Sequence, residues 1–169
     1  KAIANGQPAM SSREIILHIG LGKTGTSSLQ TYLSRTAASL LGSSNYRYCV
    51  VTNEGRLLSG TELVKVAKKA PLGYLSSTPN ICRVLKLEEF TQELEVLWDR
   101  GETPIFSQED WSRTGKVFYD ADIFSSLDCR VRVLGYLRPQ VPWFNSGWWQ
   151  WWAWNEDFGS PRDVISRWE

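Results

Sequence analysis

Short apolar runs alternate along the chain with amphipathic stretches. The apolar runs predict β-strands over residues 14–19, 46–52, 104–107 and 130–137. The amphipathic stretches predict helices over residues 26–41, 61–70, 86–100, 119–127, 141–158 and 161–168. Strands that alternate with helices favour an α/β fold, in which a parallel sheet is flanked by helices in a three-layer sandwich.

Length and composition fit one globular domain. The chain has 169 residues, of which 42% are hydrophobic and 22% are charged. We assign residues 10–169 to the domain and interpret residues 1–9 as an added remnant or a disordered arm, because Met10 is the only methionine. No stretch of 18 apolar residues predicts a membrane span. A net charge of +1 argues against a broad nucleic-acid-binding surface.

The cysteines and the histidine argue against a disulfide framework and against a metal site. The chain has three widely separated cysteines, Cys49, Cys82 and Cys129, and a single histidine. This pattern predicts three buried, reduced thiols and no structural metal. It favours a cytoplasmic protein.

A glycine-rich segment follows the first predicted strand and leads into the first predicted helix. Residues 18–30 read HIGLGKTGTSSLQ, and we call residues 20–28 the glycine loop. Glycines let the backbone approach a ligand closely, and the helix that follows offers unpaired N–H groups to an anion. Lys23 adds a cation, and hydroxyl donors come from Thr24, Thr26, Ser27 and Ser28. The segment therefore predicts an anion cradle.

The glycine loop departs from the common loop of nucleoside-triphosphate-binding proteins. That pattern, G-x-x-x-x-G-K-[ST], would need glycine at position 17, where this chain has Leu17. The segment instead resembles the 5′-phosphosulfate loop of sulfotransferases that use 3′-phosphoadenosine 5′-phosphosulfate (PAPS). The resemblance implies that PAPS is held by loop residues, namely Gly22, Lys23, Thr24, Gly25, Thr26, Ser27 and Ser28.

A second segment resembles the same family. Residues 136–147 read YLRPQVPWFNSG, with Arg138 at the end of a predicted strand and Ser146 eight residues later. In the family, an arginine and a serine with this separation hold the 3′-phosphate of the nucleotide. Arginine suits that task because its guanidinium makes paired, charge-assisted hydrogen bonds to phosphate.

An acidic turn, residues 108–111, follows the predicted strand 104–107. Its Glu109 lies in an S-x-E pattern like that of family members that act on sugars and similar alcohols. The resemblance implies that Glu109 is the general base and that Lys23 stabilises the leaving phosphate, with no metal. Asp110 and His18 are substitutes for the base, and a helix cap or a surface carboxylate is the alternative role for Glu109. The three segments all follow strands, so we expect them to meet at one edge of the sheet.

Six of the nine tryptophans lie within residues 143–154. One packed core cannot easily take all of them. Either about half of them pack in the core, or exposed rings form a platform for a sugar or aromatic acceptor or a contact surface between copies of the chain. A small molecule or a glycan is the expected acceptor. The other residues of this stretch do not indicate which small molecule or glycan the acceptor is.

The resemblance is incomplete, and two other functions stay open. The family's later, basic R-K-G loop has no counterpart here, which predicts a compact or C-terminally truncated variant. A kinase-like enzyme with a phosphate-binding loop is one alternative. A non-catalytic module that binds carbohydrate or assembles through its tryptophans is the other.

Overall fold

The sheet has five strands and is mostly parallel. The computed structural model describes residues 13–42, 44–154 and 159–166. The strands lie in the order β3-β2-β4-β1-β5. Their bounds are β1 Glu14–Gly20, β2 Tyr46–Val51, β3 Leu57–Ser59, β4 Thr103–Gln108 and β5 Arg130–Tyr136. β1 lies between β4 and β5 and runs parallel to both, whereas the short β3 is antiparallel to β2. The predicted α/β class is confirmed, and β3 is an addition to the expected parallel sheet.

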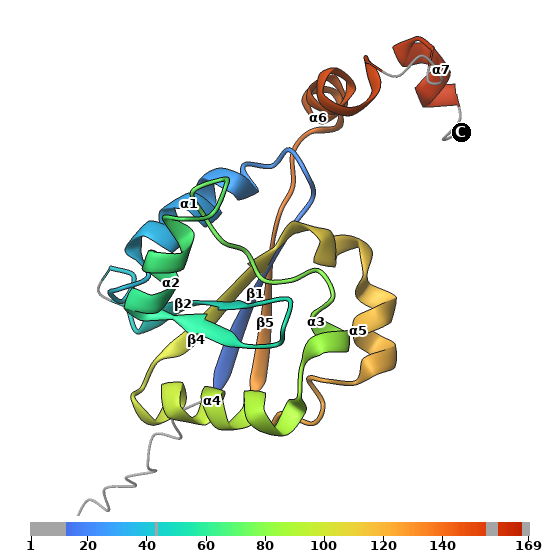
Figure 1. Cartoon of the computed structure of the whole chain (residues 1–169). Helices are drawn as coiled ribbons and strands as arrows, with labels where there is room; N and C mark the ends of the chain where they lie inside the picture. The colour runs from blue at the N-terminus through green and yellow to red at the C-terminus, as the bar shows by residue number, and fades with distance from the viewer. Residues whose placement is uncertain (1–12, 43, 155–158, 167–169) are drawn as a thin grey trace, which may run out of the picture.

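Helices cover both faces of the sheet, as Figure 1 shows. They are α1 Thr26–Thr36, α2 Gly60–Ala67, α3 Ile81–Val84, α4 Leu87–Asp99, α5 Gly115–Ala121, α6 Gln140–Gly147 and α7 Pro161–Ser166. A 3-10 helix, η1 Glu109–Arg113, follows β4, and a π-helical turn, η2 Trp148–Trp152, follows α6. None of the helices in the described ranges is long and apolar enough to cross a membrane.

Alternating strand residues build one core on each face of the sheet. Ile16 of β1 packs with Leu33 of α1 and Leu63 of α2 on one face. Leu17 of β1 packs with Leu94 of α4 on the other. This alternation follows from the two-residue period of a strand. Among the described residues, every member of the two clusters lies before residue 132.

Three predicted helices have other bounds in the structure, and one of them is α2, which spans Gly60–Ala67 instead of residues 61–70. α1 ends at Thr36 instead of residue 41: the Leu41 N–H, which would continue the helix by donating to the Ala37 carbonyl, donates to the Tyr46 carbonyl at 3.0 Å, and Ala37 accepts from the Arg47 side chain at 3.1 Å. α5 spans Gly115–Ala121 instead of residues 119–127, and Asp122 ends it in the left-handed region at φ 47°. Left-handed residues commonly terminate helices.

The predicted helix over residues 141–158 is wrong in its detail. α6 gives way to the π-helical turn, which is closed by a hydrogen bond of 2.8 Å from the Ala153 N–H to the Trp148 carbonyl. A π turn contains one more residue than an α turn and so redirects the side chains that follow. Residues 155–158 of that prediction, and residues 167 and 168 of the last predicted helix, lie outside the described residues.

Candidate functional site

Three segments from distant parts of the sequence meet beyond the carboxyl ends of the central strands. The glycine loop follows β1, η1 follows β4, and the link to α6 follows β5. This meeting point was expected, because β4, β1 and β5 are neighbouring parallel strands. Residues of all three segments line the same two cavities.

The glycine loop is shaped by backbone conformations that few residues adopt. Gly25 has φ 87° and Lys23 has φ 70°, both in the left-handed region. Glycine takes this conformation without penalty, whereas a lysine does so rarely and such residues concentrate at functional sites. The Thr24 hydroxyl donates to the Leu21 carbonyl at 2.6 Å and so closes the turn from inside.

The start of α1 leaves its backbone N–H groups without a side-chain cap. Its N-cap residue is Gly25, and no side chain caps the first turn. Thr26 is buried, while Ser27 and Ser28 are exposed. The first turn of the helix therefore presents backbone N–H groups and two hydroxyls at the positive end of the helix dipole.

A cavity of about 370 Å³, which we call the loop cavity, collects most of the predicted nucleotide-binding residues. Its lining residues are Gly22, Lys23, Gly25, Thr26, Ser27, Ser28, Glu109, Arg138, Ser146, Gln150 and Trp151. Of the residues expected to hold a nucleotide, only Thr24 does not line it. Lys23 and Arg138 give this cavity two cations against the single carboxylate of Glu109.

Side chains from the segment after β5 hold the backbone of the glycine loop. Arg138 donates from Nη1 to the Lys23 carbonyl at 3.2 Å, so its guanidinium faces the lysine turn. Trp143 donates from Nε1 to the Gly22 carbonyl at 2.8 Å. The two predicted phosphate-binding motifs therefore touch, although they are more than a hundred residues apart in the sequence.

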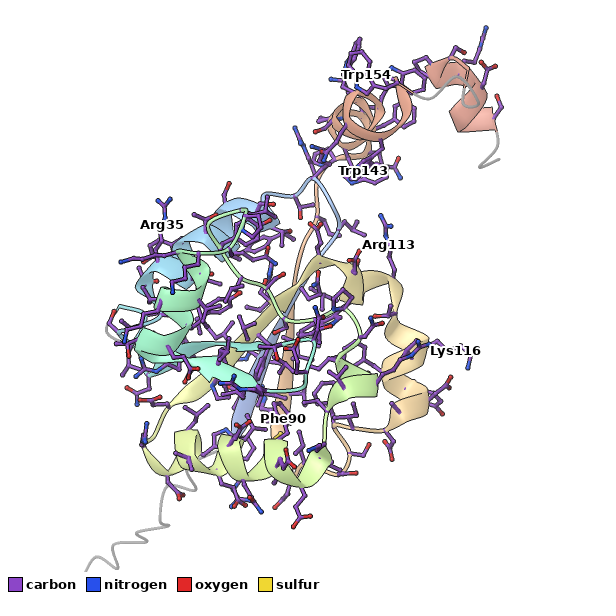
Figure 2. All side chains as sticks on the ribbon, in the orientation of Figure 1. Arg35, Phe90, Arg113, Lys116, Trp143 and Trp154 are labelled. Carbon is purple, nitrogen blue, oxygen red and sulfur yellow. The ribbon has the colours of Figure 1, made fainter. Side chains whose placement is uncertain are left out.

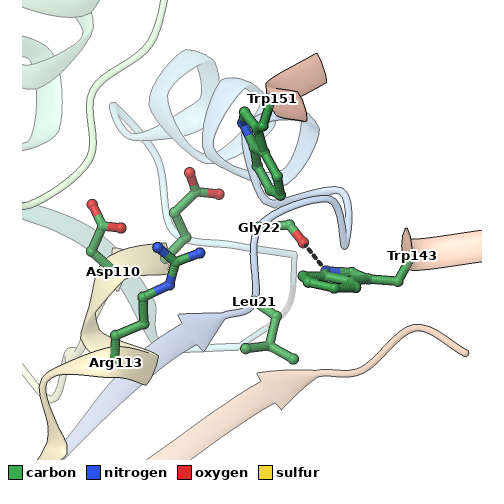
Figure 3. Close-up of a pocket in the computed structure, with 7 residues that line it drawn as sticks. Leu21, Gly22, Asp110, Arg113, Trp143 and Trp151 are labelled. Carbon is green, nitrogen blue, oxygen red and sulfur yellow. Dashed lines mark hydrogen bonds between the residues drawn. The ribbon is translucent and has the colours of Figure 1, made fainter. Parts of the chain in front are cut away.

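A second cavity of about 700 Å³ lies beside the loop cavity, and we call it the tryptophan cavity (Figure 3). Its lining residues are Leu21, Gly22, Glu109, Asp110, Arg113, Trp143 and Trp151. Glu109, Gly22 and Trp151 belong to both cavities. Glu109 therefore stands where a group bound in one cavity would meet a group bound in the other.

Gln108 takes the capping role that was the alternative for Glu109. The Gln108 side chain accepts a hydrogen bond of 3.2 Å from the backbone N–H of Asp110 and so caps η1. The Glu109 side chain is half-buried and faces the cavities instead. Asp110, the first substitute for the base, is exposed and lines only the tryptophan cavity.

His18, the second substitute, lies away from both cavities. It is buried in β1, with Nδ1 2.8 Å from the Ser107 hydroxyl, which also accepts a hydrogen bond of 3.0 Å from the Gln30 amide. The Ser107 hydroxyl can donate to Nδ1 or accept from it, so this contact is compatible with both neutral tautomers, while Nε2 is buried with no hydrogen-bond partner among the described residues. Burial lowers the pKa of His18, so its neutral form is favoured. We assign it to the core.

The tryptophan segment divides between the site and the surface. Trp143 and Trp151 line the tryptophan cavity, with ring centroids 6.4 Å apart. Trp149 and Trp154 are exposed, at 59% and 79% of their surface, and the Trp152 side chain lies outside the described residues. Part of the cluster therefore lines a cavity, and part of it is exposed.

Three residues at the site were missed by sequence reasoning. Gln150 lines the loop cavity, while Leu21 and Arg113 line the tryptophan cavity. Gln150 could have been found, because it lies four residues after Ser146 and therefore on the same side of a helix. Arg113 carries no local signal, since it reaches the site only through the 3-10 turn that follows β4.

The cysteines and acidic residues form no metal centre in the described part of the chain. No cluster of three His, Cys, Asp or Glu side chains occurs there. Cys49 is buried, but Cys82 and Cys129 are only half-buried, which corrects the expectation of three buried thiols.

Comparison with protein-family models, with curated proteins and with solved structures found no match to this chain.

Proposed function

We propose that this protein is a PAPS-dependent sulfotransferase, which transfers a sulfuryl group to a hydroxyl or amine acceptor. One observation carries the proposal: a single cavity is lined by Lys23, by the N-terminus of α1, and by Arg138 and Ser146. These are the groups needed to hold an adenosine nucleotide that carries an anion at each end. The loop-cavity volume of about 370 Å³ lies within the range of small-molecule sites, about 300–1,000 Å³.

The donor would lie across the loop cavity. Its 5′-phosphosulfate would occupy the glycine loop, against Lys23 and the first turn of α1. Its 3′-phosphate would meet Arg138, with Ser146 as a neutral donor. Arg138 would then exchange its hydrogen bond with the Lys23 carbonyl for charge-assisted bonds to phosphate, which are stronger.

The acceptor would enter through the tryptophan cavity. Its oxygen attacks the sulfur atom, the bond between sulfur and the bridging oxygen breaks, and adenosine 3′,5′-bisphosphate leaves. Glu109 takes the acceptor proton, because it is the carboxylate shared by both cavities. Lys23 and the helix N-terminus stabilise the charge that develops on the leaving phosphate. No metal takes part in this scheme.

Three features of the structure support a location, an acceptor class and an association between copies for the proposed enzyme. The three cysteines are unpaired in the structure, which supports a cytoplasmic location. A small molecule or a glycan is the acceptor, because the tryptophan cavity combines indole rings with carboxylates. The exposed rings of Trp149 and Trp154 support association between copies through this segment.

A thermal-shift titration tests nucleotide binding. Adenosine 3′,5′-bisphosphate at a hundred times its Kd stabilises a protein by about 2.7 kcal/mol, which for this chain length raises Tm by about 5–10 °C. Lys23→Ala and Arg138→Ala should each remove most of that shift. Arg35→Ala is the matched control, since Arg35 is an exposed cation at the far end of α1. The absence of a shift at millimolar nucleotide would contradict the proposal.

Two further measurements separate the alternatives. A shift with ATP and Mg²⁺, but none with adenosine 3′,5′-bisphosphate, would identify a kinase-like enzyme instead. Glycan binding that persists in Lys23→Ala, with no nucleotide binding at all, would identify a non-catalytic module. If sulfuryl transfer is observed, Glu109→Gln should lower kcat by about 10²–10⁴-fold while the nucleotide shift persists.

A further inference from the structure

Trp151 stands at the boundary between the two cavities. It lines both of them, and Figure 3 shows its ring above Gly22. A Cβ atom at position 22 would lie 3.0 Å from Cη2 of this ring, so the glycine leaves the space that the indole occupies. The Lys23 ammonium lies 5.9 Å from the centroid of the same ring, within the range of a cation–π contact.

The two groups that the proposed reaction needs most carry opposite charges and face one cavity. Lys23 and Glu109 both line the loop cavity. An ion pair between them would block both groups, because Glu109 would be less able to accept a proton and Lys23 would be less able to bind the phosphate. Among the described residues, no ion pair joins them, and neither group pairs with another charged side chain.

The indole ring offers Lys23 another partner. A partly exposed ion pair and an exposed cation–π contact stabilise a protein by similar small amounts. The position of the partner therefore decides which contact the flexible lysine side chain makes. Trp151 is fixed close to the loop by its packing over Gly22 and by its edge-on contact with Trp143.

We propose that Trp151 is a positioning residue that holds the Lys23 ammonium over its indole ring, away from Glu109, until the donor nucleotide binds. This inference rests on the proposed function for the roles of Lys23 and Glu109. On nucleotide binding, the ammonium leaves the ring for the phosphate, because a full negative charge attracts it more strongly than the ring does. Glu109 stays unpaired and able to accept the acceptor proton.

Lysine NMR tests the resting arrangement without any nucleotide. Reductive ¹³C-methylation of the lysines keeps their charge, and the Lys23 signal is identified by its loss in Lys23→Arg. An ammonium above an indole face should give methyl protons shifted upfield relative to the other lysines. The shift should disappear in Trp151→Leu and persist in Trp154→Leu, whose ring lines neither cavity. A Lys23 signal without an upfield shift in the wild-type protein would overturn the proposal.

A double-mutant cycle then tests the separation of Lys23 from Glu109. Trp151→Leu should raise the Kd for adenosine 3′,5′-bisphosphate by five- to tenfold, because Lys23 then pairs with Glu109. Adding Glu109→Gln should restore the affinity, since the competing carboxylate is gone, and Trp151→Phe should retain it. A loss of affinity that Glu109→Gln does not restore would show that the ring only packs, and the proposal would be wrong.

The two experiments separate this inference from the proposed function. A wild-type protein that shows the Lys23 shift but binds no nucleotide contradicts the proposed sulfotransferase and leaves the indole contact established. A protein that binds nucleotide with unchanged affinity in Trp151→Leu contradicts only the role of Trp151. Far-UV circular dichroism of each variant confirms that it is folded before either result is read.

Discussion

Replacing Arg47 alone should destabilise the protein more than replacing Arg47 together with its ion-pair partner, Glu102. Arg47 on β2 forms a two-point ion pair with Glu102, with Nε 2.9 Å from Oε2 and Nη2 2.8 Å from Oε1. The two side chains are only 15% and 10% exposed. The third nitrogen, Nη1, donates to the Ala37 carbonyl at the end of α1. The pair therefore links the end of α1, the helix that follows the glycine loop, to β2 and to the start of β4.

The magnitude follows from what each variant leaves behind. Arg47→Met leaves a mostly buried carboxylate and an Ala37 carbonyl without this donor, which should lower the free energy of unfolding by about 3 kcal/mol. Arg47→Met with Glu102→Leu removes both charges, and should lose about 1 kcal/mol or less. Urea unfolding at pH 7, followed by tryptophan fluorescence, measures both values. The reasoning is refuted if the double variant is as unstable as Arg47→Met.

The same pair sets a dependence on acid. The hydrogen bond from Arg47 is the main cause that holds the pKa of Glu102 below its ordinary value of 4.5. The stability that this pair contributes is therefore fully present above pH 4.5. It is lost as the pH falls through the lowered pKa of the folded state. Arg47→Met should abolish this part of the acid sensitivity, as measured by urea midpoints between pH 5 and pH 3.

Three further changes probe the core and the glycine loop. Burial lowers the pKa of His18 from 6.5, so stability should fall as the pH drops below that value. His18→Asn should therefore flatten the pH dependence of the urea midpoint between pH 7.5 and pH 5.5. A steeper pH dependence in this variant would contradict the reasoning. Gly20→Ala places a Cβ 2.6 Å from the Thr26 hydroxyl oxygen and should cost about 1–3 kcal/mol in calorimetry. Thr26→Ala should recover part of that loss, and no recovery would show that the clash lies elsewhere. Trp98→Phe removes the hydrogen bond of 3.0 Å from Nε1 to the Glu14 carbonyl, and it should lower the free energy of unfolding by about 1–2 kcal/mol. An unchanged urea midpoint would exclude a role for this bond in stability.

The α/β class could be predicted because the central strands β1 and β4 are buried on both faces. β1 and β4 are buried along almost their whole length around the short apolar runs of residues 15–17 and 104–106, which is typical of central parallel strands. β3 and α3 have only three and four residues, so neither is long enough to repeat its pattern twice. β3 exists because β2 supplies a partner, with Val50 opposite Leu58, and this contact is not a local property of the sequence.

The convergence of the candidate site could be predicted, but its details could not. A strand-loop-helix order fixes where residues 20–28 and Arg138 end up, because parallel strands bring their carboxyl ends together. The contact between Arg138 and the Lys23 carbonyl depends on side-chain placement across two loops. The position of Trp151 depends on a π-helical turn, which a periodicity of 3.6 residues does not reveal.

The packed interior ends earlier in the chain than the last residues that line the loop cavity. In the described part of the protein, both hydrophobic clusters are complete by residue 131, whereas Arg138, Ser146 and Trp151 all come later. A protein clipped by a protease just after β5 would lose α6, η2 and α7 but keep the five-stranded sheet, the helices from α1 to α5 and a cooperative melting curve. It would nevertheless lack Arg138, one of the two cations that line the loop cavity. Spectroscopic evidence of folding therefore says nothing about competence for ligand, and intact mass must be verified on every preparation used in a binding assay.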